Sequence, residues 1–179
     1  MANLPKAGKI LDVGACESPL SLMLASSGYK VWANDTRRYP FSHPNLKIDT
    51  KSIIDLDKRN FFDVVICLST LEHIGIDVYE NNSEPNLDIQ AIDIIRKLLK
   101  PGGKLLLTTP IDKKHRDIAG SRVYTIEELK LILHSFSNTD IKIGFKDRKQ
   151  TWKLSQGLPQ GFKSFGPKPC AVALISAVK

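Results

Sequence analysis

The stretch KILDVGACESPLSLMLASSG, residues 9–28, places a strand, a tight turn and a helix in direct succession. KILDV is a short apolar run, which is typical of a buried strand. Ser18 and Pro19 then open a helix as N-cap and first helical residue, and Gly28 ends it. A strand joined to a helix by a short turn is the basic unit of α/β folds, so this stretch restricts the chain to that class.

Strand and helix patterns continue to alternate after Gly28. The apolar patterns predict strands at 29–35, 45–49, 61–69, 104–110, 140–146 and 170–178, and helices at 86–103 and 125–136. Pro101-Gly102-Gly103 ends the first of these helices, and Thr125 with Glu128 forms a capping box at the start of the second. No helix separates the last two strands, so we expect them to pair antiparallel. The expected fold is an open, mostly parallel seven-stranded sheet with helices on both faces and a C-terminal antiparallel hairpin, in one domain of residues 1–179.

Composition agrees with a soluble globular enzyme or binding protein. Hydrophobic residues make up 42% of the 179 and charged residues 25%, and no apolar run is long enough to span a bilayer. The N-terminus has no apolar signal segment, so we expect a cytoplasmic protein. The three cysteines include no CxxC pair, which argues against a disulfide framework and against a metal site. Cys67 and Cys170 lie in apolar runs and are expected to be packing residues.

The charge is divided unevenly between the two halves of the chain. Residues 1–99 carry a net charge of −2 and residues 100–179 a net charge of +9. A basic half is compatible with an anionic acceptor, a nucleic acid or improved solubility, and the sequence leaves these open. Stacking aromatics are not interleaved with the lysines, so nothing specifically signals a nucleic-acid surface.

The turn after the first strand is unlike a phosphate-binding loop. A dinucleotide site carries G-x-G-x-x-G, whereas Gly14, Cys16 and Pro19 occupy those positions here. Glu17 adds a negative charge that would repel phosphate. Both features argue against NAD, FAD and ATP, and they favour a ligand that has no phosphate and carries some positive charge.

Acidic residues stand at the ends of three successive strands around this turn. Asp12 ends the first strand, Asp35 the second and Asp49 the third. In a parallel sheet these ends meet at one edge, where α/β proteins bind ligands. S-adenosylmethionine suits such an edge, because Asp35 can accept hydrogen bonds from both ribose hydroxyls and Gly14 lets the backbone approach the methionine moiety.

Four segments together resemble the class I S-adenosylmethionine-dependent methyltransferases: ILDVGACES, VWAND, FFDVVICLSTLEHIG and LLKPGGKLLLTTP. The resemblance runs from Lys9 to about Phe136 and is of the small "LEH…LKPGG" type. It implies S-adenosylmethionine as cofactor. It assigns the first binding motif to Asp12, Gly14 and Ala15, the ribose-binding acid to Asp35, the adenine-side acid to Asp49, and the cleft wall to Leu68 and Ser69. Cys16, Glu17 and Thr36 are expected to contribute to the same site. A subgroup associated with glycan and polysaccharide pathways looks similar in its GxxESPL loop.

Two histidines are candidates for a general base. His73 follows the fourth strand in STLEHIG, where a methyl acceptor would enter, and a histidine suits proton transfer at neutral pH. His115 lies in a polar loop after the fifth strand, beside Lys113, Lys114 and Arg116, which would suit an anionic acceptor. A loop-stabilising role for His73 and a purely solvated loop at 111–124 remain open alternatives.

The sequence thus predicts methyl transfer to an oxygen or nitrogen of a small molecule or saccharide. The alternatives are an RNA methyltransferase that uses the basic half, a cofactor-binding module without catalysis, and, disfavoured by the turn, a nucleotide-dependent oxidoreductase. The identity of the acceptor and the oligomeric state are not encoded in any recognisable pattern.

Overall fold

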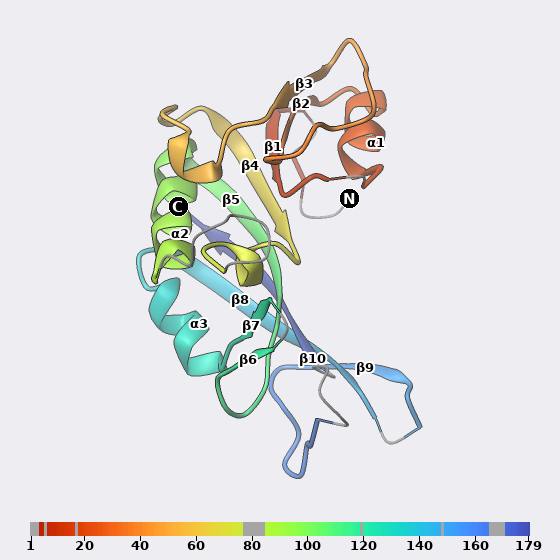
Figure 1. Ribbon diagram of the computed structural model, residues 1–179, viewed down its shortest axis with the longest axis vertical. Coiled ribbons are helices and arrows are strands. Elements are labelled where there is room, and N and C mark those ends of the chain that lie inside the picture. The colour runs from red at the N-terminus through yellow and green to blue at the C-terminus, as the bar shows by residue number, and fades with distance from the viewer. Residues whose placement is uncertain are drawn as a thin grey trace.

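The computed structural model describes residues 4–5, 7–16, 18–76, 85–118, 120–147, 149–164 and 171–179. Within these ranges the main sheet has eight strands in the order β3-β2-β1-β4-β5-β10-β8-β9 (Figure 1). The strands are β1 (Lys9–Val13), β2 (Lys30–Asn34), β3 (Leu46–Asp49), β4 (Phe62–Leu68), β5 (Leu99–Pro110), β8 (Ser137–Lys146), β9 (Trp152–Ser155) and β10 (Ala171–Val178). A separate antiparallel pair consists of β6 (Arg116–Ile118) and β7 (Ser121–Val123).

The sheet confirms the predicted α/β class. Strands β3, β2, β1, β4 and β5 pair in parallel. Strand β10 runs antiparallel between β5 and β8, as expected for the last two predicted strands. Because the five parallel strands point the same way, their carboxyl ends form one edge, and the loops there position the site.

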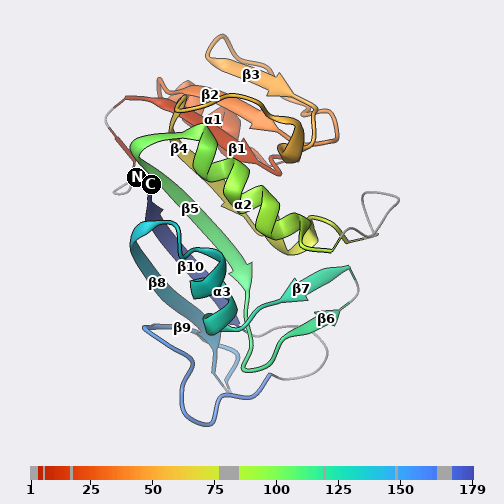
Figure 2. The ribbon, with the colours of Figure 1, turned by 90° about the vertical axis from the view of Figure 1, so that its left-hand side faces the viewer.

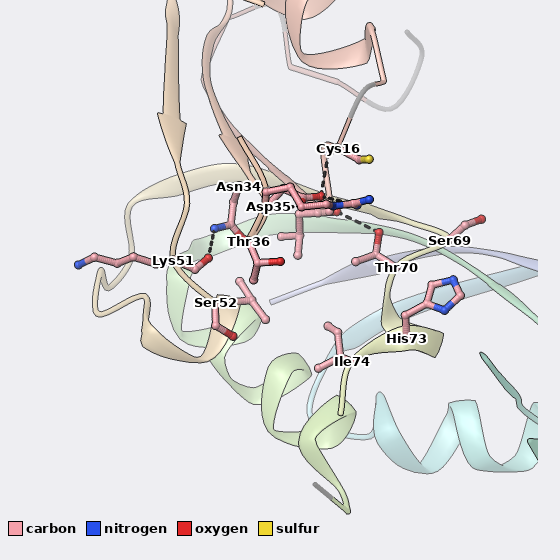
Figure 3. A pocket seen from close by; sticks show the side chains of 14 residues that line it. Cys16, Asn34, Asp35, Thr36, Lys51, Ser52, Ser69, Thr70, His73 and Ile74 are labelled. Carbon is pink, nitrogen blue, oxygen red and sulfur yellow. Dashed lines mark hydrogen bonds and ion pairs between the residues drawn. The ribbon is translucent and has the colours of Figure 1, made fainter. Parts of the chain in front are cut away.

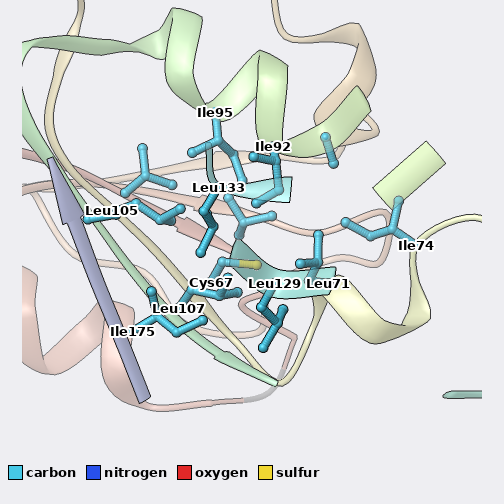
Figure 4. Close-up of a cluster of buried hydrophobic side chains, with 14 of the residues drawn as sticks. Cys67, Leu71, Ile74, Ile92, Ile95, Leu105, Leu107, Leu129, Leu133 and Ile175 are labelled. Carbon is cyan, nitrogen blue, oxygen red and sulfur yellow. The ribbon is translucent and has the colours of Figure 1, made fainter. Parts of the chain in front are cut away.

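Helices cover both faces of the sheet. Helix α1 (Leu20–Ser26) packs with even-numbered residues of β1 and β4, such as Ile10 and Ile66. Helices α2 (Leu87–Leu98) and α3 (Ile126–Ile132) lie on the opposite face, as Figure 2 shows. They cover the larger core, where Ile92 and Ile95 of α2 belong to one cluster with Leu105, Leu107, Ile175 and the buried Cys67 (Figure 4).

The helix boundaries follow the sequence signals with small shifts. Thr125 and Glu128 form the predicted capping box: the Thr125 hydroxyl accepts from the Glu128 N–H at 3.2 Å, and the Glu128 carboxylate accepts from the Thr125 N–H at 2.7 Å. Helix α1 begins one residue later than predicted, with Pro19 as its N-cap, while the Ser18 hydroxyl accepts from the Leu20 N–H. Helix α3 ends at Ile132 rather than at residue 136.

The sheet differs from prediction in strand number and in the starts of two strands, and a hairpin replaces an expected loop. Strand β9 is an eighth strand at the sheet edge, and its four residues, three of them exposed, are too few for the alternation of Trp152 and Leu154 to predict a strand. Helix α2 ends at Leu98 rather than at residue 103, and strand β5 starts at Leu99, so Pro101-Gly102-Gly103 lies within the strand, where the pairing with β4 is irregular. Strand β8 starts three residues earlier than expected, and the β6–β7 hairpin occupies what looked like a loop.

None of the helices in the described part of the chain is long and apolar enough to cross a membrane. Cys16 and Cys67 are free thiols, and Cys170 lies outside the described residues. The single-domain organisation and the cytoplasmic location stay predictions.

Candidate functional site

A cavity of about 290 Å³ opens at the carboxyl edge of the parallel strands (Figure 3). Its walls come from the segments that follow β1, β2, β3 and β4, together with η2 (Leu71–His73). The lining residues are Val13, Gly14, Cys16, Asn34, Asp35, Thr36, Arg37, Lys51, Ser52, Ile53, Ser69, Thr70, His73 and Ile74. Since the sheet order is β3-β2-β1-β4, the cavity is an elongated cleft that crosses four neighbouring strand ends.

Asn34 fastens three strand ends to one another. Its carbonyl accepts hydrogen bonds from the N–H groups of Gly14 (2.8 Å) and Ala15 (3.0 Å). Its side-chain amide donates to the carbonyl of Lys51 at 2.8 Å and to that of Asp49 at 3.3 Å. Through its carbonyl and its side-chain amide together, the buried Asn34 fixes the turn after β1 relative to the segment after β3.

Tyr39 supports the other end of the turn. Its hydroxyl donates to the Ser18 carbonyl at 2.6 Å and accepts from the Leu22 N–H at 3.3 Å. The ring is 1% exposed, so it joins the start of α1 to the core. Sequence reasoning missed both Asn34 and Tyr39; an aromatic inside the polar segment between β2 and β3 was the available signal for Tyr39.

Gly14 is required by both its backbone angle and its surroundings. Its φ of +72° lies in the left-handed region, and a Cβ placed there would come within 2.2 Å of the Thr70 hydroxyl oxygen. Cys16 (φ 44°) and Ser69 (φ 48°) adopt the same unfavourable region without being glycines. Strained backbone of this kind costs about 1–3 kcal/mol per residue and concentrates at ligand sites.

Asp35 is the charged centre of the cleft. Its side chain is 5% exposed, and its carboxylate accepts from the Cys16 N–H, the Arg37 N–H and the Arg37 guanidinium. Burial by itself raises the pKa of Asp35, but the hydrogen bonds and charge of Arg37, together with the Cys16 amide, outweigh it and hold the pKa below its ordinary value. Asp35 is therefore an ionised, oriented acceptor.

Asp12 lies under α1 rather than in the cleft lining. It is 3% exposed, and its carboxylate accepts from the Ser21 hydroxyl at 2.7 Å. Burial raises the pKa of Asp12 to about 6, although the Ser21 hydrogen bond opposes the shift. Its geometry is that of a buried link between β1 and α1.

His73 stands at the end of the cleft beside Thr70 and Ile74. Its Nδ1 is 2.7 Å from the carbonyl oxygen of Gly120, which lies between β6 and β7. A carbonyl only accepts, so Nδ1 carries the proton in this contact and Nε2 becomes the basic nitrogen of the neutral ring. The β6–β7 hairpin thereby sets the orientation and tautomer of His73.

Arg122 of β7 reinforces the same junction. Its guanidinium donates to the Ile74 carbonyl and lies 3.8 Å from the Asp88 carboxylate of α2. Asp88 also accepts from the Tyr124 hydroxyl at 2.7 Å, and both partners are buried. Burial is the main cause that raises the pKa of Tyr124, with the negative charge of Asp88 adding to it.

His115 lies outside the cleft lining. Its Nδ1 is 3.0 Å from the Glu128 carboxylate and its Nε2 is 3.5 Å from that of Asp117, so both ring nitrogens face acids. Burial raises the pKa of Glu128, but hydrogen bonds from Thr125 and the nearby His115 bring it below its ordinary value. The arrangement ties β6 to the start of α3.

The structure brings some of the predicted site residues together and leaves others apart. Five predicted cofactor residues line the cleft with His73: Gly14, Cys16, Asp35, Thr36 and Ser69. Four do not, namely Asp12, Ala15, Asp49 and Leu68, and Glu17 lies outside the described residues. Eight residues line it without having been predicted: Val13, Asn34, Arg37, Lys51, Ser52, Ile53, Thr70 and Ile74.

Solved structures share the whole architecture. A methyltransferase from Burkholderia thailandensis, named 1,6-didemethyltoxoflavin-N1-methyltransferase and solved with S-adenosylhomocysteine, superposes with a TM-score of 0.71 at 17% identity, over 99% of this chain and 73% of that one. The N-methyltransferase NodS of Bradyrhizobium japonicum superposes with a TM-score of 0.62 at 15% identity, over 96% and 78% of the two chains. The fold is that of the class I, Rossmann-like S-adenosylmethionine-dependent methyltransferases, which confirms the resemblance seen in the sequence.

Within that class, the chain belongs to the family described as "Caenorhabditis protein of unknown function, DUF268", whose profile matches residues 51–156. Curated relatives carry methyltransferase names. A ubiquinone biosynthesis O-methyltransferase of Rickettsia conorii is 28% identical over 188 residues, covering 88% of this chain and 61% of its own length. One from Xanthomonas oryzae pv. oryzae is 33% identical over 120 residues, covering 60% of this chain and 46% of its own length. The chain thus spans about half to three fifths of these relatives.

Proposed function

We propose that the protein is an S-adenosylmethionine-dependent methyltransferase whose cofactor lies in the cleft at the carboxyl edge of the sheet. The observation that carries the proposal is Asp35, an ionised carboxylate held at the end of β2 by two backbone N–H groups and facing a cleft of about 290 Å³. A vicinal diol is a suitable partner for such a carboxylate, because each oxygen can accept one hydroxyl.

The residues along the cleft fit the parts of the cofactor in the order of the strands. The segment after β3, with Ser52 and the buried Ile53, would face the adenine, and Asp35 would hold the ribose. The turn at Gly14 and Cys16 would lie against the methionine moiety, and glycine at position 14 lets this turn pack closely on Thr70. The bound sulfonium supplies an activated methyl group, so the chain has to bind, orient and exclude water.

His73 is proposed as the general base for the acceptor. Its place at the β4 end of the cleft, at the end of η2, puts it beyond the residues assigned to the methionine moiety. The hydrogen bond from Nδ1–H to the Gly120 carbonyl leaves Nε2 as the nitrogen that takes a proton from a hydroxyl or amine. The role of His115 as a base is less well supported, since both of its nitrogens face carboxylates.

We infer that the methyl acceptor is a small molecule, and we propose a saccharide as its chemical class. The relatives' names point to small-molecule acceptors for those proteins. The net charge of +9 over residues 100–179 supports an anionic acceptor and keeps RNA as an alternative. Binding to mixed RNA that falls steeply with salt would favour RNA, while salt-insensitive or absent binding would exclude it.

Isothermal titration with S-adenosylhomocysteine tests the proposal. The wild-type protein is expected to bind with micromolar affinity, and Asp35→Ala to weaken binding by at least about 100-fold, because two charge-assisted hydrogen bonds are lost. Asp63→Ala is a matched control: Asp63 also accepts a backbone N–H and pairs with Lys100, but at the opposite end of the strands. Folded wild-type protein that does not bind would refute the proposal.

A further inference from the structure

We propose that Arg37 competes with the cofactor for Asp35, so that its guanidinium holds two acceptor positions that the ribose hydroxyls need and must leave before those hydroxyls bind. The inference rests on the proposed function, because it concerns the same carboxylate. It adds a residue that sets the affinity and the ligand preference of the cleft.

The hydrogen bonds to Asp35 use every acceptor position of its carboxylate. Oδ1 accepts from the Arg37 N–H at 2.9 Å and from Arg37 Nε at 2.9 Å. Oδ2 accepts from the Cys16 N–H at 2.9 Å and from Arg37 Nη2 at 3.2 Å. A carboxylate offers about four lone-pair positions, two on each oxygen. An incoming hydroxyl therefore finds no acceptor position on Asp35 while the guanidinium is in place.

The four donors divide into two groups that differ in exposure. The two backbone N–H groups belong to the turn after β1 and the segment after β2, and they keep the carboxylate oriented. The two guanidinium donors belong to a side chain that is 56% exposed, whereas the Asp35 side chain is 5% exposed. The guanidinium can therefore leave Asp35 while the two backbone donors hold the carboxylate in place.

Departure of the guanidinium opens one acceptor position on each carboxylate oxygen. Two positions, one per oxygen, match the two hydroxyls of a vicinal diol. A ligand that lacks both hydroxyls needs neither position, so it gains nothing when the guanidinium leaves. Removal of the guanidinium should therefore strengthen the binding of a vicinal diol and leave the binding of a dideoxy ligand unchanged.

The exchange also predicts an effect of salt. The pair of Arg37 with Asp35 is partly exposed, so dissolved ions screen it. High salt weakens the competitor and brings the wild type closer to a protein that lacks the guanidinium. If Arg37 had only a structural role, the ligand affinities of the wild type and of Arg37→Ala would not approach each other at high salt.

The experiment is isothermal titration of S-adenosylhomocysteine into wild type, Arg37→Ala and Arg38→Ala. Arg38 is the exposed neighbour of equal charge, and its substitution controls for the loss of one positive charge near the cleft. Arg37→Ala is expected to bind about fivefold more tightly, the factor that corresponds to an exposed ion pair. The gain is expected to shrink between low and high salt, and adenosine is expected to show it while 2′,3′-dideoxyadenosine does not.

The outcomes separate this inference from the proposed function. Tighter binding by Arg37→Ala, with Arg38→Ala unchanged, supports the competition. Equal or weaker binding by Arg37→Ala overturns it, while wild-type binding keeps the proposed function. Folded proteins that all fail to bind overturn the proposed function and this inference with it. Arg37→Lys, which keeps the charge but cannot form the fork, provides the same comparison if Arg37→Ala does not fold.

Discussion

The two ends of the cleft are held together in different ways. The proposed cofactor side consists of the turn after β1 and the segments after β2 and β3, and the links between these segments join residues 14 to 21 positions apart, such as Cys16 to Asp35. The acceptor side consists of η2 and the β6–β7 hairpin, and its links join residues 47 and 48 positions apart, as in His73 to Gly120. The first side belongs to the strand ends themselves, whereas the second depends on how a distant hairpin docks.

This difference implies that each side can be damaged separately. Substitutions on the cofactor side should change cofactor affinity, and those on the acceptor side should change turnover or local stability without affecting that affinity. The predictions below test this separation, beginning with the largest expected effect.

Gly14→Ala is expected to destabilise the protein by about 3 kcal/mol, from left-handed strain together with overpacking against Thr70. Gly28→Ala is the matched control, since Gly28 also has positive φ (+93°) but has nothing within 4 Å of an added Cβ. Its expected cost is about 1 kcal/mol. Denaturant unfolding measures both, and equal losses at the two glycines would show that Thr70 does not crowd the turn.

In an assay with an identified methyl acceptor, His73→Asn is expected to lower kcat by about 100-fold, the effect typical of losing a general base. The asparagine amide can still donate to the Gly120 carbonyl, so the hairpin stays docked and S-adenosylhomocysteine affinity stays within about twofold. His134→Asn is the control, because His134 Nδ1 also contacts a carbonyl, that of Leu131, outside the cleft lining. Full activity of His73→Asn would remove the base assignment.

Glu72→Gln tests a buried acid of η2, on the acceptor side. Glu72 is 3% exposed, its Oε2 has no hydrogen-bond partner among the described residues, and burial raises its pKa from 4.5 to about 7. The folded state therefore holds the proton more tightly than the unfolded state does. Stability from this group is complete below pH 4.5 and is lost as the pH rises through about 7.

Between pH 5.5 and pH 8 the wild type should consequently lose about 2 kcal/mol more unfolding free energy than Glu72→Gln. Denaturant titrations at the two pH values measure the difference. Asp12, whose pKa is raised to about 6, contributes equally to both proteins and cancels. Parallel pH profiles of the two proteins would show that Glu72 keeps an ordinary pKa.

Arg122→Ala is expected to cost about 1.5 kcal/mol, because it removes a charge-assisted hydrogen bond to the Ile74 carbonyl and the nearby charge of Asp88. S-adenosylhomocysteine affinity should not change. Arg38→Ala is the control at an exposed position, and it should change the free energy of unfolding by no more than about 0.5 kcal/mol. A large loss of cofactor affinity in Arg122→Ala would show that the two sides are coupled.

The sequence predicted the α/β sheet well, because strand periodicity is a local signal, and the acid after β2 lies in the cleft as expected. Asp12 and Leu68, which were expected in the site, lie outside the cleft lining because side chains alternate along the strands. Asp12 shares a strand face with Ile10, and Leu68 with Ile66, and Ile10 and Ile66 pack on the α1 side. Their side chains therefore point away from the larger core and outside the cleft lining.

Local sequence signals could not predict the structure of the acceptor side. The β6–β7 hairpin was read as a polar loop, since three-residue strands carry too few positions for a period to show. His73 was identified by its place after β4, but its tautomer depends on Gly120, and no spacing rule links residues 47 positions apart. Arg37 was missed because an arginine next to Arg38 in a charged segment reads as an exposed cation.

A crystal structure of the protein with S-adenosylhomocysteine tests the central claim most directly. We expect the ligand to lie across the ends of β3, β2, β1 and β4. Both ribose hydroxyls should donate hydrogen bonds to the Asp35 carboxylate, and the Arg37 guanidinium should be displaced from it. A ligand bound elsewhere would contradict the proposed function. A ribose in the cleft with the Arg37 fork still closed on Asp35 would contradict the competition between them.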